Sequence, residues 1–257
     1  FEIVERPPPG VRPIRTHFVL KAVRDAQGSI SKYKARLVAD GSRQDWSTFQ
    51  ETRSPTASLP VVKLLIALAA SLGKRLEAFD VPGAYLHSRT SEATSTPGDP
   101  NIFVTLPDNR TGKLKKFLYG LKQAGLEWYE THKQFFLSLG YEVSETEPCL
   151  FIWREDKTAP PGAPLGLRER YHYVIVYVDD DLAFGSDNAL MERLYNAMCA
   201  QYGSIKRKQG NFSFLGASLQ QSNEGIKLTM PGYCKRLLQE WGFENAKAMR
   251  TPESIYE

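Results

Sequence analysis

The sequence has few of the residues that form disulfide frameworks or hold transition metals. Its 257 residues include only three cysteines and four histidines. Cys149, Cys199 and Cys234 lie far apart and lack the spacing of a zinc site. The histidines are equally scattered, and we interpret all four as structural or surface residues. The sequence therefore predicts neither a disulfide framework nor a zinc site, and it fits a reducing compartment.

Long apolar runs, a signal peptide and internal repeats are also missing. The longest candidate run, 61–72, is shorter than the roughly 20 residues that span a bilayer, and it contains Lys63. We therefore expect no membrane partner. The chain begins at Phe1 without a methionine, so we expect a piece of a longer polypeptide. The net charge of +4 permits a nucleic-acid partner without requiring one.

Helical and strand patterns alternate along the rest of the chain, whose 42% hydrophobic content is sufficient for a substantial core. The middle of the chain gives a strand, a helix, a β-hairpin, a helix and a strand. We predict from this order an α+β fold of the split-βαβ type, with an antiparallel sheet and two helices on one face. Helices are predicted over 59–72, 124–139, 187–202 and 231–241, strands over 18–23, 33–38, 76–81, 102–106, 173–185 (a hairpin), 204–208 and 212–216, and loops over 88–101 and 156–168.

The segment Tyr177-Val178-Asp179-Asp180 places adjacent carboxylates between two apolar runs. Both runs are rich in β-branched and aromatic residues, so we predict two strands with the acids at the hairpin turn. Like charges crowded on a turn are unfavourable unless water or a cation compensates them. Two divalent cations held by carboxylate oxygens would do so. Aspartate is also a common turn residue, and these residues alone leave that alternative open.

A second acid, Asp80, ends the predicted strand 76–81 and is followed by Tyr85. The predicted sheet could bring Asp80 to Asp179 and Asp180 despite the long sequence separation. A lone aspartate at a strand end is more often a turn or cap residue, so the assignment depends on the motifs around it.

Six motifs in a fixed order make the sequence resemble the reverse transcriptases of Ty1/copia-type retrotransposons. Any one of them is weak, but two are long and their order covers nearly the whole chain. The motifs are Tyr-Lys-Ala-Arg-Leu-Val-Ala at 33–39, Phe-Asp-Val with Ala-Tyr-Leu-His at 79–87, Leu-Tyr-Gly-Leu-Lys-Gln-Ala at 118–124, Tyr-Val-Asp-Asp at 177–180, Phe-Leu-Gly at 214–216 and Lys-Ala-Met-Arg-Thr-Pro at 247–252.

The resemblance implies a right-hand polymerase fold with fingers, palm and the start of a thumb. It divides the chain into fingers with part of a palm helix (1–75), the first catalytic strand and its loop (76–112), a fingers–palm connection with a palm helix (113–142), the palm with the Asp-Asp hairpin and primer grip (143–217) and the start of the thumb (218–257).

The same resemblance implies the site. Asp80, Asp179 and Asp180 would be catalytic and would hold two Mg²⁺ ions, or Mn²⁺, with the Val81 carbonyl as a backbone ligand. The remaining site residues would bind the substrates. The dNTP-binding residues would be Lys34, Arg36, Tyr85 (which would exclude a 2′-hydroxyl), Tyr119, Gly120 and Lys206 (which would protonate pyrophosphate), and the primer grip would be Phe214, Leu215 and Gly216.

Three positions depart from the family pattern. Asp181 stands where the family has Met, Ile or Leu, and we expect it either to perturb metal binding or to point to solvent. Asp40 replaces a Lys or Arg, and Ser88 replaces a Gly. None of the three removes an expected catalytic residue.

We therefore expect an RNA-directed and DNA-directed DNA polymerase from a retrotransposon polyprotein. The expected partners are a primer with an RNA or DNA template, and dNTPs, with RNase H and integrase domains outside this chain. Its setting would be a virus-like particle in the cytoplasm, or the nucleus. The alternatives are a decayed or domesticated copy that binds nucleic acid or scaffolds a complex without catalysis, and a structural domain whose acids are ordinary turn residues.

Overall fold

The computed structural model describes residues 1–24, 30–88, 102–155 and 170–247, and the chain forms three antiparallel or mixed sheets with four α-helices in these ranges. The predicted loops at 88–101 and 156–168 fall almost entirely outside the described residues, as does most of the motif at 247–252. The first sheet has the strand order β1-β6-β5-β2-β3, the second β11-β4-β10-β9-β8-β7 and the third β12-β13-β14.

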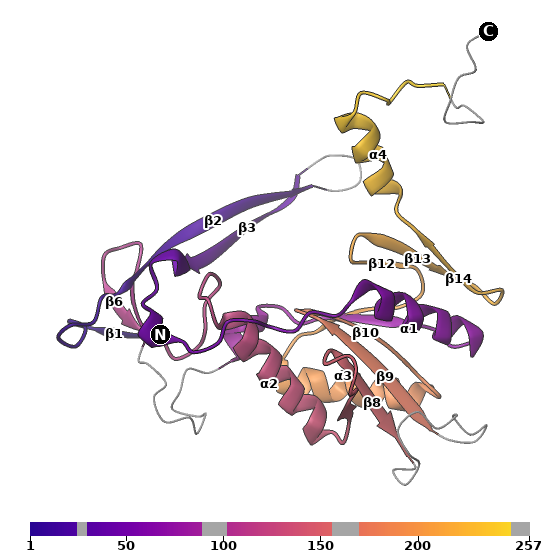
Figure 1. Cartoon of the computed structure of the whole chain (residues 1–257), viewed down its shortest axis with the longest axis horizontal. Coiled ribbons are helices and arrows are strands. Elements are labelled where there is room, and N and C mark those ends of the chain that lie inside the picture. The colour runs from indigo at the N-terminus through magenta and orange to yellow at the C-terminus, as the bar shows by residue number, and fades with distance from the viewer. Residues whose placement is uncertain (25–29, 89–101, 156–169, 248–257) are drawn as a thin grey trace.

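The first sheet carries a long hairpin arm formed by β2 and β3 (Figure 1). The arm extends away from a small base made by the other three strands. Residues 102–112, which we group with the first catalytic strand, contribute β5 and most of β6 to this base. The bounds are β1 Glu2–Val4, β2 Ile14–Arg24, β3 Ile30–Ala39, β5 Phe103–Thr105 and β6 Thr111–Lys113.

The second sheet is built around β4, whose two neighbours come from much later in the chain. β10 pairs with one edge of β4 and β11 with the other, both antiparallel. β9 and β10 form the predicted hairpin, and β8 and β7 extend the sheet beyond β9. The bounds are β4 Glu77–Asp80, β7 Glu142–Val143, β8 Leu150–Arg154, β9 Tyr171–Tyr177, β10 Asp180–Gly185 and β11 Lys206–Lys208.

Both faces of the second sheet are covered. α2 (Ala124–Ser138) and α3 (Asn188–Tyr202) pack on one face, where Phe136 and Leu194 meet Val174 of β9 in one core cluster. α1 (Leu59–Ser71) and the third sheet cover the opposite face. The predicted pair of helices on one face is confirmed, and the other face is buried as well because its strand residues are apolar too.

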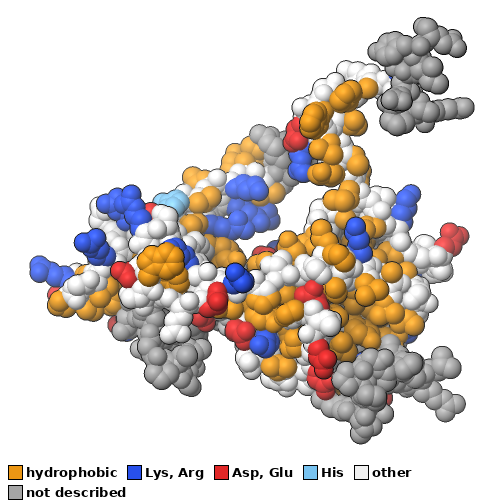
Figure 2. All heavy atoms as spheres, viewed as in Figure 1, with side chains coloured by type: hydrophobic (Ala, Val, Ile, Leu, Met, Phe, Trp, Pro, Cys, Tyr) orange, Lys and Arg blue, Asp and Glu red, His pale blue; other side chains and the backbone are white. Residues whose placement is uncertain are grey.

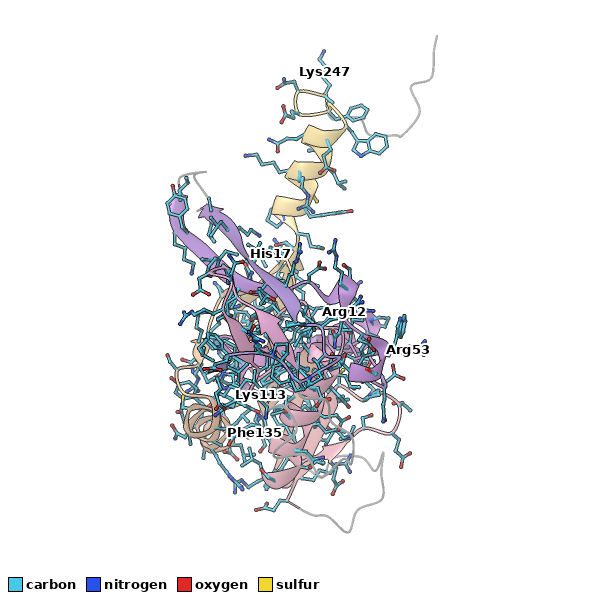
Figure 3. All side chains as sticks on the ribbon, turned by 90° about the vertical axis from the view of Figure 1, so that its left-hand side faces the viewer. Arg12, His17, Arg53, Lys113, Phe135 and Lys247 are labelled. Carbon is cyan, nitrogen blue, oxygen red and sulfur yellow. The ribbon has the colours of Figure 1, made fainter. Side chains whose placement is uncertain are left out.

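The third sheet lies next to α1, and the last helix follows it toward the C-terminus (Figure 1). α4 (Pro231–Glu240) stands apart on the same side of the molecule as the tip of the hairpin arm. Lys247 lies past the outer end of α4 (Figure 3). The third-sheet bounds are β12 Phe212–Phe214, β13 Ala217–Gln221 and β14 Ile226–Thr229.

Six strands in the described ranges were not predicted from the sequence: β1, β6, β7, β8, β13 and β14. The β8 segment Leu150–Arg154 is a short, mostly apolar run, and such a run has no periodicity that separates a strand from a buried helix end. The four predicted helices and the Asp-Asp hairpin lie within two residues of their expected bounds.

Candidate active site

A row of four side chains crosses one end of the second sheet in register. Lys206 of β11 pairs with Asp80 of β4, Asp80 pairs with Asp180 of β10, and Asp180 pairs with Tyr177 of β9. Directly opposite residues in an antiparallel sheet place their side chains on the same face, with Cβ atoms about 5 Å apart. The sheet thus brings the two predicted acids Asp80 and Asp180 together.

Two lysines balance these acids. Lys206 forms an ion pair with Asp80, and Lys208 Nζ lies 3.7 Å from Asp180 Oδ1. Burial raises the pKa of Asp180; Lys208 opposes this increase, and the charges of Asp179 and Asp80 add to it. The negative charges of the site are therefore only partly compensated, and nearby positive charge stabilises them.

Asp179 occupies the tight turn between β9 and β10 with Val178. Val178 has φ +59°, a left-handed conformation that is strained for a β-branched residue. Two hydrogen bonds hold the turn: Trp128 Nε1 donates to the Val178 carbonyl at 2.5 Å, and the Val81 amide donates to the Asp179 carbonyl at 3.0 Å. The second bond ties the turn to the end of β4, so Asp179 stands beside Asp80 and Asp180.

The carboxylate oxygens at this turn are the type of ligand that a hard divalent cation prefers. Three carboxylates lie at one sheet end, and Mg²⁺ prefers a few carboxylates completed by substrate phosphates and water to an all-protein cage. In the ranges that the structure describes, no three acid, histidine or cysteine side chains converge as a ready-made metal site. Asp80 instead turns to Lys206, so the ammonium group supplies the positive charge that a cation would bring.

An arginine and two tyrosines gather beside these acids. The rings of Tyr85 and Tyr119 lie 4.7 Å apart between centroids, and the Arg36 guanidinium lies 5.3 Å from the Tyr119 ring centre. Burial raises the pKa of both tyrosines, and the negative charge of Asp179 raises it further. The structure therefore brings together three predicted dNTP-binding residues that come from β3, the 3₁₀ helix Ala84–His87 and the segment before α2.

Arg36 shows which face of the hairpin arm is directed toward the acids. Residues two apart on a strand share a face, so Lys34 lies on the same face as Arg36, one step nearer the tip. Lys21 pairs with Lys34 across the hairpin and adds a charge that the sequence analysis did not assign to the site. Figure 2 shows Lys and Arg side chains where the arm borders the hollow above the second sheet.

Gly120 fits tightly against the base of the arm. Its φ is +91°, and a Cβ atom there would lie 2.1 Å from the Ala39 carbonyl oxygen. The neighbouring Tyr119 carbonyl accepts a hydrogen bond from the Ala39 amide at 2.8 Å. This close backbone approach fixes Tyr119 relative to β3 and hence to Arg36.

The predicted primer-grip residues form the turn between β12 and β13. Leu215 and Gly216 have φ values of +48° and +80°, as in a two-residue hairpin turn, and Phe214 pairs with Ala217. The Phe214 side chain is buried in the core shared with α1. The side chain of Phe214 is thus committed to packing, whereas Leu215 is only partly buried and Gly216 is exposed.

The alternative that Asp181 points to solvent is wrong, and its effect on metal binding stays a prediction. Alternation along β10 places its side chain on the face covered by α2, opposite to Asp180, where it is fully buried. There its carboxylate lies 3.0 Å from His132 Nε2, and His132 Nδ1 lies 2.9 Å from the Tyr202 hydroxyl. Burial raises the pKa of Asp181, and the adjacent His132 lowers it.

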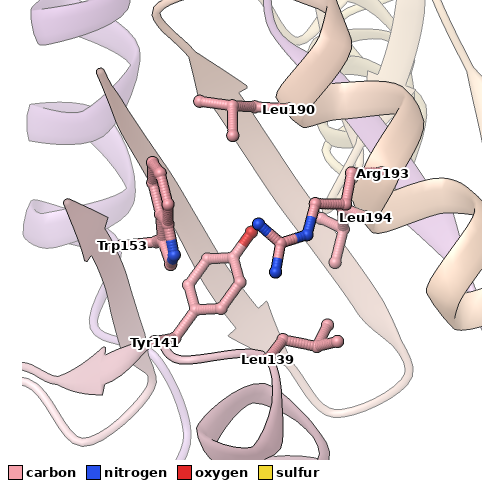
Figure 4. A pocket seen from close by; sticks show the side chains of 6 residues that line it. All are labelled: Leu139, Tyr141, Trp153, Leu190, Arg193 and Leu194. Carbon is pink, nitrogen blue, oxygen red and sulfur yellow. The ribbon is translucent and has the colours of Figure 1, made fainter. Parts of the chain in front are cut away.

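A small pocket lies on the face of the second sheet that α2 and α3 cover (Figure 4). It is bordered by Tyr141, Trp153 and Arg193 and has a volume of about 10 Å³, room for about one water molecule. It is too small for a nucleotide, and we assign it no ligand.

Comparison with known proteins shows the family of the chain. Residues 1–255 match the family described as reverse transcriptase (RNA-dependent DNA polymerase). The chain is 29% identical over 255 residues to the Retrovirus-related Pol polyprotein from transposon TNT 1-94 of Nicotiana tabacum, covering 98% of this chain and 18% of that protein. It is 25% identical over 237 residues to the Truncated transposon Ty1-A Gag-Pol polyprotein of Saccharomyces cerevisiae (strain ATCC 204508 / S288c), covering 86% of this chain and 18% of that protein.

Among solved structures, the chain is similar to the foamy viral protease-reverse transcriptase dRH in complex with ds DNA. The identity is 14% and the TM-score 0.43, over 91% of this chain and 33% of that one.

The chain belongs to the reverse transcriptase family, and its relatives are Pol polyproteins of Ty1/copia-type retrotransposons. The predicted family and the predicted α+β class with antiparallel sheets are confirmed. The chain spans about a fifth of the length of these curated relatives. No helix in the described ranges is long and apolar enough to cross a membrane.

Proposed function

We propose that this chain is the polymerase core of a retrotransposon Pol polyprotein and extends a DNA primer on an RNA or DNA template. The observation that carries the proposal is the register of the second sheet, which sets Asp80 opposite Asp180 and ties the Asp179 turn to the end of β4. Asp80, Asp179 and Asp180 would hold two Mg²⁺ ions, or Mn²⁺, with the Val81 carbonyl. The metals would lower the pKa of the primer 3′-hydroxyl and neutralise charge on the leaving pyrophosphate.

The protein's own groups would position the nucleotide. Arg36 presents a planar guanidinium suited to bidentate phosphate contacts, and Lys34 and Lys21 add positive charge further along the same face of the arm. Tyr85 and Tyr119 would form an aromatic floor beside the acids, with Tyr85 excluding a ribose 2′-hydroxyl.

The primer terminus and the polyphosphate would lie at opposite sides of the acids. The Phe214–Gly216 turn would hold the primer, and Gly120 would let the backbone approach the incoming nucleotide and template. Lys206 would reach the pyrophosphate, leaving its ion pair with Asp80 once a cation is bound.

We place the fingers at 1–75, the palm between 76 and 217 with the connection 113–142, and the start of the thumb at 218–257. The natural setting would be a virus-like particle in the cytoplasm, or the nucleus, with RNase H and integrase domains supplied elsewhere in the polyprotein.

Primer extension on an RNA template tests the proposal. The wild-type chain should extend a DNA primer in Mg²⁺, and Asp179→Asn should lose at least about 100-fold in rate while primer–template affinity stays within about twofold. Asp108→Asn is the matched control, because Asp108 lies in the β5–β6 turn with an exposed partner, Arg110. Tight primer–template binding without extension by the wild-type chain would contradict the proposal and support a decayed copy that only binds nucleic acid.

A further inference from the structure

The backbone of Asp179 is fixed by two hydrogen bonds, one on each flanking carbonyl. The Asp179 carbonyl accepts from the Val81 amide, and the Val178 carbonyl accepts from the Trp128 indole. The first donor is backbone, but the second is a side chain of α2, a separate element. Val178 is strained, and a strained conformation persists only where its surroundings hold it.

Trp128 is itself held in place by a ring beneath it. Its indole is stacked on the His132 imidazole with 4.7 Å between ring centroids and an interplanar angle of 18°. Trp128 and His132 are each 1% exposed, so neither ring has solvent to move into. The indole N–H is therefore aimed at the Val178 carbonyl by packing as well as by the hydrogen bond.

His132 is fixed at both of its ring nitrogens. Nε2 faces the Asp181 carboxylate at 3.0 Å and Nδ1 faces the Tyr202 hydroxyl at 2.9 Å. A neutral imidazole with its proton on Nε2 donates to Asp181 and accepts from Tyr202, which satisfies all three buried groups. Asp181 belongs to β10, two residues beyond Asp179. The chain of contacts therefore runs from Val178 through Trp128 and His132 to Asp181. Both of its ends lie on the β9–β10 hairpin, which it holds against α2.

The same cluster also reaches the segment that carries Tyr85. His87, at the end of that 3₁₀ helix, lies 5.2 Å from the Tyr202 ring and 6.3 Å from the Trp128 ring between centroids. The rings of α2 and α3 therefore lie behind both the Asp179 turn and the Tyr85 segment.

We propose that Trp128 is a positioning residue for Asp179, and that Asp181, His132 and Tyr202 form a buried clamp that holds Trp128 in the orientation this role requires. The proposal rests on the polymerase function proposed above. Trp128 touches neither substrate nor metal in this role; it acts through the Val178 carbonyl.

Trp128→Phe removes the indole donor and keeps an aromatic ring against His132. We expect kcat for primer extension to fall by about 10- to 100-fold, since small misplacements of a reacting group cost this much. The KM for dNTP and the affinity for primer–template should stay within about twofold. Trp153→Phe, the same substitution on β8 of the same sheet, should leave kcat within about twofold.

Hydrogen exchange gives a readout that does not need activity. The Val81 amide should exchange at least about tenfold faster in Trp128→Phe than in the wild-type chain, while core amides of α3 keep their protection. If Trp128→Phe does not fold, Tyr202→Phe, which removes one hydroxyl from the clamp, replaces it and should lower kcat about threefold and expose the Val81 amide. Unchanged kcat with an unchanged Val81 amide in a folded variant would overturn the positioning role. Loss of extension by the wild-type chain would count against the proposed function alone, because the Val81 amide still decides the positioning role.

Discussion

Asp80 and Asp180 stand directly opposite each other on β4 and β10, so two carboxylates a hundred residues apart in the sequence share one face of a sheet. Lys206 extends the same row on the far side of Asp80. Like charges directly opposite in a sheet are destabilising, and the ion pair between Lys206 and Asp80 offsets part of that repulsion. Part of the negative charge of the site is thus balanced by Lys206, an ammonium group that a bound metal ion would have to displace.

Lys206→Met should therefore lower the Mg²⁺ concentration that gives half-maximal extension, by about three- to tenfold, because the ion no longer competes with an ammonium group. If Lys206 acts mainly as the acid for pyrophosphate, kcat falls and the Mg²⁺ requirement stays unchanged. Initial rates across a Mg²⁺ titration separate the two roles. Lys227→Met, which removes an exposed lysine of β14, is the control and should change neither quantity.

Tyr85→Ala should admit ribonucleotides, because it removes a ring that packs on Tyr119 near Asp179 and that would exclude the 2′-hydroxyl. The ratio of kcat/KM for dNTP to that for rNTP should fall at least about tenfold, a loss of roughly 1.4 kcal/mol of discrimination. Tyr85→Phe keeps the ring and should retain the wild-type ratio. Discrimination that survives in Tyr85→Ala would remove Tyr85 from this role.

Gly120→Ala should separate the Tyr119 segment from β3. The added Cβ meets the Ala39 carbonyl oxygen at 2.1 Å; a Cβ atom has no rotamer and the carbonyl is backbone, so the contact cannot be relieved by a rotamer change. We expect the free energy of unfolding to fall by about 2–4 kcal/mol and extension to be lost with it. Gly10 has a similar φ of +82° but open space around it. In denaturant unfolding, Gly10→Ala should therefore lower the free energy of unfolding by only about 1 kcal/mol, the cost of the backbone strain.

His172 should make stability depend on pH below neutrality. Burial lowers the pKa of His172 from 6.5 to about 3, and the Tyr141 hydroxyl and the Met191 sulfur contact its two ring nitrogens. Between pH 6.5 and 3 the unfolded chain takes up a proton that the folded chain does not, so the free energy of unfolding falls as pH falls. Between pH 7 and pH 5 this group alone should remove about 2 kcal/mol.

His172→Gln carries no titratable group and supplies the comparison. The free energy of unfolding of the wild-type chain, minus that of His172→Gln, should fall by about 2 kcal/mol between pH 7 and pH 5. An equal acid dependence in both chains would show that His172 does not remain neutral when folded.

The site divides into parts that were readable in the sequence and parts that were not. Asp179 and Asp180 were readable because apolar strand patterns flank them, and Arg36 because it lies in a long motif. The partnership of Lys206 with Asp80 depends on the register of β11 against β4, which no local pattern encodes. Alternation along β10 separates Asp181 from Asp180, but only the packing of α2 and α3 shows that His132 and Tyr202 lie on the face of Asp181.

The position of β4 between β10 and β11 also determines when the site can form. Both of its neighbouring strands are made at least a hundred residues later, and Lys206 follows Asp80 by 126 residues. During synthesis the strand that bears Asp80 leaves the ribosome with both edges unpaired; one edge can pair only after β10 has emerged, and the other only after β11 has emerged. Assembly of the catalytic end is therefore a long-range event, because β4 keeps an open edge while the 126 residues between Asp80 and Lys206 are made.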